Sequence, residues 1–470
     1  MHVSPTAQTQ IVRSTESLQT LNCNLSPIIH SEWHSFLEEN QSRIHSLLEQ
    51  YGSPLHLVAP QVLAANLAKI EAAIQSHGVK AQVYYAMKAN KGRGLVSTAA
   101  ASGFGIDVAS EYEFKLACEL SPLHTPLSLS GPVKPTSLFQ AAIERNVNIS
   151  IDSVEELRAL RDHVMSHRSQ NPARIYLRYR PSFKAKTRFG MSTEDVMACT
   201  RILTEFRLLI EFIGFHMHLS GYSAIERGRS VAELVGLSEV LDTHGLKTQF
   251  INIGGGMPVQ YVAPDAFETF MELHQGSAVE YKGGQPSWFY PYGGRLTLEA
   301  WMREFMDYFL APGLKIADWL RRCDITLAVE PGRSALDQVA ISLFSVGLVK
   351  DRGSFSTVFL NGSSFSASET WFQSDYLCDP ILLRFGPRGR APIKTTPAYY
   401  LAGHSCLEDD IIAYRPFSGD VAIASGDALA FINTGGYHMD LLENNFHHHP
   451  TPARLNIDFS NLTFTQECAK

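Results

Sequence analysis

Short runs of β-forming residues alternate with longer amphipathic stretches from about residue 55 onward, and this alternation constrains the fold more than any other feature. It is the pattern of parallel strands joined by helical crossovers. A first run is expected at residues 55–58. The eight runs that follow it are at residues 82–87, 105–108, 127–130, 147–151, 175–179, 213–218, 249–253 and 325–329. Eight is the number of strands that closes a (β/α)8 barrel.

The pattern changes after Arg333, where strand-like runs have no long helices between them. At 470 residues the chain exceeds the size at which one hydrophobic core usually keeps growing. We predict an N-terminal extension (1–50) that packs with the β-domain, a barrel (51–334), and a C-terminal, mainly-β domain of sandwich or barrel type (335–470). A stretch rich in glycine, proline and aromatic residues at 281–295, within an insertion at about 260–300, interrupts the barrel before its last strand.

Composition narrows the class of function. Hydrophobic residues make up 45% of the chain and charged residues 19%, and no apolar run approaches the ~20 residues that cross a bilayer. The net charge of −7 gives no electrostatic reason to bind nucleic acid. Seven scattered cysteines without a Cys-x-x-Cys pair indicate reduced thiols. The N-terminus lacks the pattern of a secretory signal. We therefore expect a cytoplasmic protein that acts on small molecules and binds neither membranes nor nucleic acid.

Lys88 stands at the end of the apolar run 82–87 and is followed by loop residues. Strand ends at the carboxyl-terminal face of a β/α barrel carry chemistry, and a partly desolvated lysine there can form a Schiff base with an aldehyde cofactor or a carbonyl substrate. A lysine that only caps a strand in water would look the same. Its role therefore depends on which residues lie beside it.

Each of two later predicted strands is followed by a turn with candidate binding groups. One turn is a glycine triplet that could bind an anion, and the other carries an acidic and a basic side chain. The glycine triplet 254–256 leaves backbone N–H groups uncovered, so it either approaches a phosphate or forms a tight turn that needs positive φ. The sequence Glu-Pro-Gly-Arg at 330–333 places a carboxylate at the barrel mouth and a guanidinium just beyond it. These two charges either have separate ligands or form an internal ion pair.

Histidines occur at alternate positions, His216 and His218, on one predicted strand, so one imidazole faces the barrel interior. Zinc is disfavoured because no third ligand follows at a suitable spacing, and the contiguous histidines 447–449 cannot easily all turn to one ion. We therefore expect no metal site. A flat imidazole stacked on a flat cofactor ring fits better.

Cys406 lies in the polar, acidic loop 403–410, unlike an inert core cysteine, and is a candidate proton donor. Tyr437 follows two glycines after a strand-like run. Arg178 begins a group of basic residues that either forms a solvated face or contributes a partner for an acidic group near the site.

Lys88, His218, the glycine triplet, the Glu-Pro-Gly-Arg sequence and the Gly-x-x-Cys-x-x-x-Asp loop occur in an order that resembles one family. This family is the fold-type III pyridoxal-phosphate enzymes, the group of diaminopimelate, ornithine and arginine decarboxylases, with alanine racemase a more distant relative. The resemblance covers residues from about 50 to 446. It implies pyridoxal 5'-phosphate as the cofactor and decarboxylation of an amino acid or amino-acid conjugate as the reaction.

By this resemblance, Lys88 forms the internal aldimine and His218 stacks on the pyridine ring. Glu330 binds the ring nitrogen and keeps it protonated. Cys406 protonates the substrate carbon after CO2 leaves, and it comes from the partner subunit of a head-to-tail homodimer with two shared active sites. The cofactor-binding residues that the resemblance implies are Lys88, Asp107, His218, Ser220, Gly221, Gly254, Gly255, Gly256, Glu330, Arg333 and Tyr437.

Two departures from the family concern phosphate and substrate. Ser220 and Gly221 are exchanged relative to the usual Gly-Ser order, so the serine–phosphate contact is shifted or replaced. Leu407 stands where diaminopimelate decarboxylases carry glutamate and ornithine decarboxylases aspartate, and it cannot accept a hydrogen bond from a substrate amine. This argues against meso-diaminopimelate unless Glu408 or Asp409 reaches the same space, and favours an amino acid or an amino-acid conjugate from a specialised pathway, such as siderophore assembly. Candidate substrate contacts are Arg178, Asp375, Asp379, Glu408 and Asp410.

Two other functions compete with decarboxylation. A racemase would use the same lysine and barrel, but Glu330 argues against it because racemases of this fold tend to place an arginine at the ring nitrogen. A catalytically silent homologue acting as a regulator would keep the barrel without the cofactor. The presence of Lys88, Glu330, Arg333 and Cys406 argues against that second alternative.

Overall fold

The computed structural model of this protein describes residues 11–12, 25–167, 169–276, 286, 288–366, 374–385, 397–418, 422–441 and 447–467. The chain divides into two compact units. The barrel unit comprises Leu63–Pro258 and Leu296–Ala335. The sheet unit comprises the described residues of Met1–Val62, Val259–Arg295 and Leu336–Lys470.

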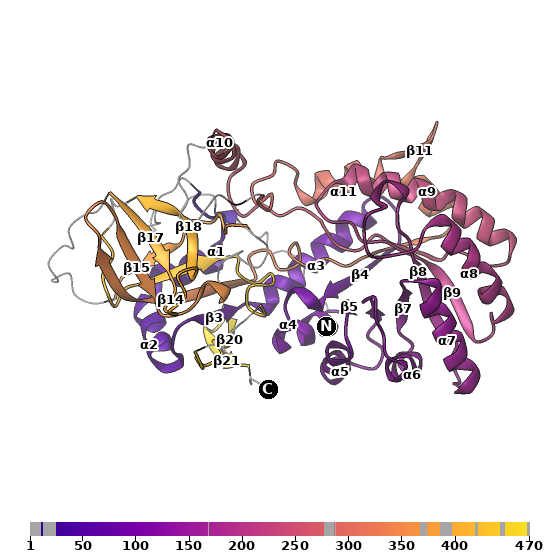
Figure 1. Ribbon diagram of the computed structural model, residues 1–470, viewed down its shortest axis with the longest axis horizontal. Coiled ribbons are helices and arrows are strands. Elements are labelled where there is room, and N and C mark those ends of the chain that lie inside the picture. The colour runs from indigo at the N-terminus through magenta and orange to yellow at the C-terminus, as the bar shows by residue number, and fades with distance from the viewer. Residues whose placement is uncertain are drawn as a thin grey trace. The chain divides into compact units, whose positions relative to one another are not determined.

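The barrel unit contains a closed ring of parallel strands (Figure 1). The neighbours around the ring follow the order β10-β13-β4-β5-β6-β7-β8-β9. The strands are β4 (Ala81–Ala86), β5 (Gly105–Val108), β6 (Leu127–Leu129), β7 (Asn148–Ile151), β8 (Ala173–Arg178), β9 (Ile210–His216), β10 (Phe250–Asn252) and β13 (Thr326–Val329). Each of the eight predicted runs corresponds to one of them, which confirms the (β/α)8 barrel.

Helices connect these strands, and α5 to α8 lie outside them (Figure 1). Serines begin several helices by accepting a hydrogen bond from a backbone N–H in the first turn, as Ser110 does for α5 and Ser153 for α7. The helices are α3 (Pro60–Gln75), α4 (Arg93–Ala101), α5 (Glu111–Leu120), α6 (Thr136–Glu144), α7 (Val154–Ser166), α8 (Thr193–Glu205), α9 (Ala224–Thr243), α11 (Leu298–Met306) and α12 (Ile316–Arg322). Shorter elements are η1 (Met87–Ala89), η2 (Ser182–Lys184), β11 (Phe309–Ala311) and β12 (Leu314–Lys315).

Side chains fill the interior of the barrel, as in other barrels of this kind. Tyr84 and Tyr176 are fully buried, and the side-chain amide of Asn148 donates to both phenol oxygens, over 3.0 and 3.4 Å. Gly105 makes room for one ring, because a Cβ at that position would lie 2.4 Å from Tyr84. This packing keeps the strands at a fixed spacing beneath their carboxyl ends.

The sheet unit is mainly β, as predicted. Its large sheet has the order β18-β17-β15-β14-β3-β20-β21, and β19 pairs with both β14 and β16. The strands are β3 (Leu55–Val58), β14 (Ala340–Asp351), β15 (Ser356–Leu360), β16 (Ile381–Leu383), β17 (Ala398–Ala402), β18 (Ile411–Ser418), β19 (Ala428–Ile432), β20 (Ala453–Asp458) and β21 (Thr463–Gln466). The remaining elements are β1 (Ile11–Val12), β2 (Ile29–His30), α1 (Ser31–Glu39), α2 (Gln41–Tyr51), α10 (Pro264–Gln275) and η3 (Ser364–Ser366).

The boundaries of the units differ from those expected from the sequence. Strand β3 pairs with β14 and β20, so the run at 55–58 belongs to the large sheet and the barrel unit begins at Leu63 rather than at residue 51. The segment Val259–Arg295 also belongs to the sheet unit, and Tyr261 stacks there on Tyr292 at 5.0 Å. Periodicity could not assign the run at 55–58, because a short buried strand has the same pattern in both kinds of sheet.

Residues 277–285 and 287 of the insertion lie outside the described residues. So do residues 420–421, which begin one of the strand-like runs expected after Arg333, at 420–424. In the described ranges no helix is long and apolar enough to cross a membrane. The thiols of Cys118, Cys199, Cys323, Cys378 and Cys406 are free.

Candidate active site

The carboxyl ends of the barrel strands bring a lysine and two carboxylates together. Lys88 lies in η1, directly after β4, and is half-buried. Asp107 lies on the neighbouring strand β5, in register with Ala86, is 1% exposed, and accepts a 3.1 Å hydrogen bond from the Ser130 hydroxyl. Burial, and then the charge of Glu330, raises the pKa of Asp107 well above its ordinary value, and Lys88 opposes this shift. The three ionisable groups are therefore close enough to influence one another electrostatically.

Glu330 follows β13 and is 2% exposed. Its Oε1 accepts a 2.8 Å hydrogen bond from the Asn252 side chain and lies 3.5 Å from Nε2 of His216. Burial disfavours the charge of this carboxyl, but the His216 imidazole and the Lys88 ammonium outweigh burial and hold its pKa below the ordinary value. Glu330 is thus a buried carboxylate that stays ionised.

His216 and His218 occupy different environments at the end of β9. His216 is buried, and its Nδ1 lies 2.6 Å from the hydroxyl oxygen of Ser150. Burial, and then the positive charge of Lys88, lowers the pKa of His218 well below its ordinary value. The Nδ1 atom of His218 accepts the backbone N–H of Gly255 over 3.3 Å. His218 is therefore a neutral imidazole that lies against the glycine triplet.

Two buried carboxylate oxygens, Glu330 Oε2 and Asp107 Oδ1, have no hydrogen-bond partner among the residues that the structure describes. An unpaired buried acceptor is costly, so such atoms usually have a ligand or water as their partner. A protonated pyridine nitrogen would satisfy the free oxygen of Glu330. The site therefore fits a pyridoxal cofactor on the chemistry of its acceptors.

The glycine triplet forms a tight turn after β10 that leaves no room for side chains. A Cβ at Gly255 would lie 2.6 Å from the Glu330 carbonyl oxygen, and Gly254 and Gly256 have φ of +65° and +82°. The backbone is therefore compatible with both interpretations of the triplet, a tight turn that needs positive φ and a turn that approaches a phosphate. The N–H groups of Gly254 and Gly255 already donate to Asn252 Oδ1 and His218 Nδ1 over 2.9 and 3.3 Å. A phosphate at this turn would therefore compete with these acceptors or bind at the half-buried Gly256.

Arg227, on α9, fixes the shape of this turn. Its guanidinium is fully buried and its Nη2 donates to the carbonyl oxygens of Leu219, Gly221 and Gly255 over 2.8 to 3.0 Å. Burial lowers the pKa of Arg227 to about 10. The loop that carries Ser220 and the glycine triplet are therefore held together by one charged group.

The remaining predicted residues of the barrel unit have varied surroundings. Arg333 is half-buried, three residues after Glu330, and Ser220 is exposed. Arg178 is 8% exposed, donates to Asp152 over 2.8 Å and stacks over the Phe189 ring at 4.5 Å. The structure thus places Arg178 in an ion pair at the end of β8 rather than on an open basic face.

In the sheet unit, Cys406 is exposed and its Sγ lies 3.0 Å from Nε2 of His447. Asp410 connects the loop that carries Cys406 to a neighbouring segment. Its carboxylate accepts hydrogen bonds from the backbone N–H groups of Ser364 and Ser405, over 2.7 and 3.0 Å. Gly403 has no space for a side chain, because a Cβ there would lie 2.1 Å from Asp410 Oδ2. Asp410 therefore shapes the loop, and Glu408 is exposed.

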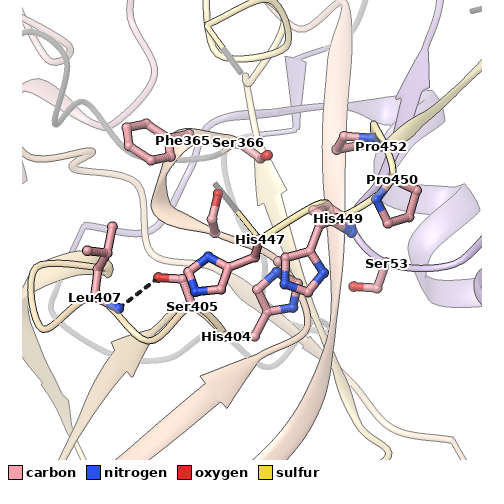
Figure 2. A pocket seen from close by; sticks show the side chains of 13 residues that line it. Ser53, Phe365, Ser366, His404, Ser405, Leu407, His447, His449, Pro450 and Pro452 are labelled. Atoms are coloured by element: carbon pink, nitrogen blue, oxygen red, sulfur yellow. Dashed lines mark hydrogen bonds between the residues drawn. The ribbon is translucent and has the colours of Figure 1, made fainter. Parts of the chain in front are cut away.

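A pocket of about 460 Å³ adjoins this loop and is lined by residues from four segments, 53–54, 362–366, 404–407 and 447–452. The imidazole rings of His404, His447 and His449 gather on one wall (Figure 2). His404 and His449 are stacked, with ring centroids 3.9 Å apart and an interplanar angle of 19°. Burial, and then the neighbouring His449 ring, lowers the pKa of His404.

The acidic residues Asp375 and Asp379, predicted to contact a substrate amine, lie instead in a buried cluster around Arg415. Arg415 donates to Asp375 Oδ2 over 3.0 Å and to Asp379 Oδ1 over 3.2 Å, and all three side chains are at most 1% exposed. Asp379 Oδ2 also accepts the backbone N–H of Leu25. The sequence could not reveal this pairing, because Arg415 lies 36 and 40 residues away.

Tyr437 lies in the turn after β19 and has a φ of +72°, which is rare for a residue with a bulky side chain. A chain of hydrogen bonds leads to this turn from β3: His56 Nδ1 lies 2.7 Å from Ser342 Oγ, which lies 2.7 Å from Thr434 Oγ1. Such strained backbone often occurs at functional sites.

Three residues of interest were not predicted from the sequence. Asn252 is a polar residue in an otherwise apolar strand, and Arg227 shares a helix face with the buried Val231, so both had a signal in the sequence. His447 had none, because it lies 41 residues from Cys406. In the described ranges no cluster of side chains is suited to hold a metal ion.

This chain was compared with known protein families and with individual proteins. A family model described as "Pyridoxal-dependent decarboxylase, pyridoxal binding domain" matches residues 64–281. An uncharacterized protein, y4yA of Sinorhizobium fredii (strain NBRC 101917 / NGR234), is 39% identical over 444 residues, which are 93% of this chain and 95% of that protein. The L-glutamyl-[BtrI acyl-carrier protein] decarboxylase of Niallia circulans is 24% identical over 443 residues, 88% of this chain and 91% of that protein.

The fold is also found among solved structures. Diaminopimelate decarboxylase from M. jannaschii, in complex with L-lysine, superimposes with a TM-score of 0.70. The two chains are 18% identical, and the match covers 90% of this chain and 92% of the other. At that identity the likeness concerns the fold.

Proposed function

This chain belongs to the family of fold-type III, pyridoxal-phosphate-dependent amino-acid decarboxylases, and from this premise we propose that it releases the α-carboxylate of an amino acid or an amino-acid conjugate as CO2. Relatives with named substrates include enzymes for diaminopimelate and for a carrier-bound L-glutamyl group. Family membership therefore leaves the substrate open.

The observation that carries the proposal is the group of ionisable residues at the barrel mouth, where Glu330 is buried and Lys88 and His218 are half-buried. Lys88, the ionised Glu330 and a neutral His218 interact with one another, and Glu330 Oε2 has no hydrogen-bond partner in the described part of the chain. A lysine there can bind an aldehyde cofactor covalently, and the carboxylate keeps the ring nitrogen protonated. Bound pyridoxal phosphate supplies the electron sink for the pair released when the Cα–carboxylate bond breaks.

Other residues of the barrel unit would hold the cofactor. His218 presents a flat, neutral ring to the pyridine, and Asp107 adds a carboxyl beside the lysine. The backbone N–H groups of the glycine triplet, with Arg333, would bind the phosphate, and Ser220 and Gly221 belong to a loop that Arg227 holds against that turn. Tyr437, from the sheet unit, would add a further phosphate hydrogen bond.

Cys406 would deliver the proton that replaces the departing carboxylate. The Sγ–H bond breaks, a Cα–H bond forms, and His447 Nε2 can return a proton to Sγ across the 3.0 Å contact. By resemblance to the family, Cys406 would act in the site of a partner subunit, so that the active form is a homodimer with two shared sites. The ionised Glu330 favours decarboxylation over racemisation, because it supports a fully protonated ring nitrogen.

The test is CO2 release by the pyridoxal-phosphate-loaded enzyme across a panel of acidic, neutral and basic amino acids and their conjugates, with the mass of the product recorded. Stoichiometric CO2 and a product lighter by one CO2 are expected. Loss of optical activity without CO2 would instead identify a racemase. Protein that shows no visible cofactor absorbance would be a silent homologue.

A further inference from the structure

The pocket beside Cys406 has an unusual lining for a site that would meet a basic substrate. Its thirteen lining residues include three histidines but no Asp, Glu, Lys or Arg. One wall carries the stacked rings of His404 and His449, and the apolar side chains of Leu407 and Phe365 also line the pocket, to the left of the histidines in this view (Figure 2). A volume of about 460 Å³ is within the range of small-molecule sites.

Glu408 and Asp409, which follow Leu407, are exposed and are not among the described residues that line the pocket, and other carboxylates of the sheet unit are already engaged. Asp410 accepts two backbone N–H groups of the pocket's own segments, at Ser364 and Ser405. Asp375 and Asp379 are paired with the buried Arg415. An ammonium group entering the pocket would therefore meet imidazoles and hydroxyls, and among the described residues no carboxylate lines the pocket to pair with it.

A metal ion is a poor occupant of the same pocket. The rings of His404 and His449 face each other at 3.9 Å, so their nitrogens do not converge on a common point. The centroids of His447 and His449 are 5.9 Å apart at an angle of 37°. The N–H group of a neutral imidazole and a serine hydroxyl are instead donors suited to a carboxylate.

The pocket also adjoins the proposed proton donor. Ser405 and Leu407, on either side of Cys406, both line it, and so does His447, the partner of the Cys406 thiol. A substrate whose Cα receives a proton from Cys406 would extend its distal end toward this pocket.

We propose that this pocket binds the distal carboxylate of the substrate, so that the enzyme acts on an acidic amino acid or an acidic amino-acid conjugate and discriminates against basic amino acids. The proposal rests on the decarboxylase function proposed above. Leu407 supports this selectivity because it is uncharged. The glutamate or aspartate that it replaces would repel a carboxylate and attract an amine.

Binding to the cofactor-loaded protein tests the pocket without turnover. Glutarate and cadaverine have five carbons each and carry two carboxylates or two ammonium groups, and isothermal titration calorimetry measures both affinities. Glutarate should bind at least about 10-fold more tightly than cadaverine. His404→Gln and His449→Gln should each weaken glutarate by about 5- to 10-fold, whereas His124→Asn, at an exposed turn of the barrel unit, should not.

A second variant keeps the test decisive if the histidine variants misfold. Leu407 is 44% exposed, so Leu407→Glu should fold normally. It should weaken glutarate and strengthen cadaverine. Tighter cadaverine binding by the native protein, or glutarate affinity unchanged in all three pocket variants, would overturn the proposal.

Turnover separates this proposal from the function on which it rests. CO2 from L-glutamate, L-2-aminoadipate or their conjugates, and not from L-lysine or L-ornithine, supports both. CO2 from the basic amino acids alone overturns the pocket assignment and leaves the decarboxylase intact. If glutarate binding depends on His404 but neither the acidic nor the basic amino acids yield CO2, the pocket assignment stands and the proposed decarboxylase function is contradicted.

Discussion

The side-chain amide of Asn252 donates a 2.8 Å hydrogen bond to Glu330 Oε1, and its carbonyl oxygen accepts the backbone N–H of Gly254 over 2.9 Å. One side chain therefore connects the carboxylate assigned to the ring nitrogen with the turn assigned to the phosphate. The two ends of the cofactor would be held by a single hydrogen-bond network. Such networks fix the orientation of catalytic groups.

Asn252→Ala should weaken pyridoxal phosphate binding about 10- to 100-fold, because it removes a hydrogen bond to a buried charge, worth about 1.5–3 kcal/mol. Cofactor titration followed by visible absorbance measures the affinity. Asn171→Ala, in an exposed loop of the same unit, is the matched control. Equal cofactor affinity in native protein and Asn252→Ala would remove Asn252 from the site.

His447→Gln should slow alkylation of Cys406 by iodoacetamide at pH 7 about 10-fold, because it removes the imidazole that can accept the thiol proton across the 3.0 Å contact. Peptide mass spectrometry follows the reaction, and the exposed thiol of Cys323 serves as an internal reference in the same sample. The measurement needs neither cofactor nor substrate. An unchanged ratio of the two alkylation rates would show that His447 does not act on Cys406.

Stability should fall as the pH drops below about 6.5, in part because of His56. Burial, and then the charge of Arg454, lowers the pKa of His56 from 6.5 to about 3, with Asp440 opposing. The unfolded chain therefore binds more protons than the native one between these values, and stability is lost as pH falls. From pH 7.0 to 5.5 this group should cost about 1.3 kcal/mol of unfolding free energy.

Urea unfolding at the two pH values, compared between native protein and His56→Gln, isolates this contribution. On acidification His56→Gln should lose about 1.3 kcal/mol less unfolding free energy than the native protein does. The control variant His124→Asn should lose as much as the native protein. An identical pH dependence in His56→Gln would mean that His56 is protonated in the folded state.

Much of the barrel mouth could be predicted from the sequence, because strand periodicity places a side chain at the end of each strand. Lys88, Asp107, His218 and Glu330 were placed in this way, and electrostatic interactions now connect them. The sheet unit was harder to predict. Its strand β3 is distant in sequence from its partners, and the pairing of Asp375 with Arg415 depends on sheet register, which local pattern does not reveal.

A shared active site predicts complementation between two inactive variants. Lys88→Ala and Cys406→Ala homodimers should each turn over poorly, since each lacks one required group in both sites. Mixing and reassembling them should restore about a quarter of native activity, because half the dimers are mixed and each of those has one intact site. Activity no greater than the sum of the separate variants would argue against Cys406 acting across an interface.

Borohydride reduction tests the central claim most directly. Treatment of the cofactor-loaded protein, followed by proteolysis and mass spectrometry, should place a single pyridoxyl-phosphate group on Lys88. Lys88→Ala should carry no label and no visible cofactor absorbance. Lys91→Ala, three residues away, should be labelled as the native protein is. A pyridoxyl group on any other lysine, or native turnover by Lys88→Ala, would contradict the assignment.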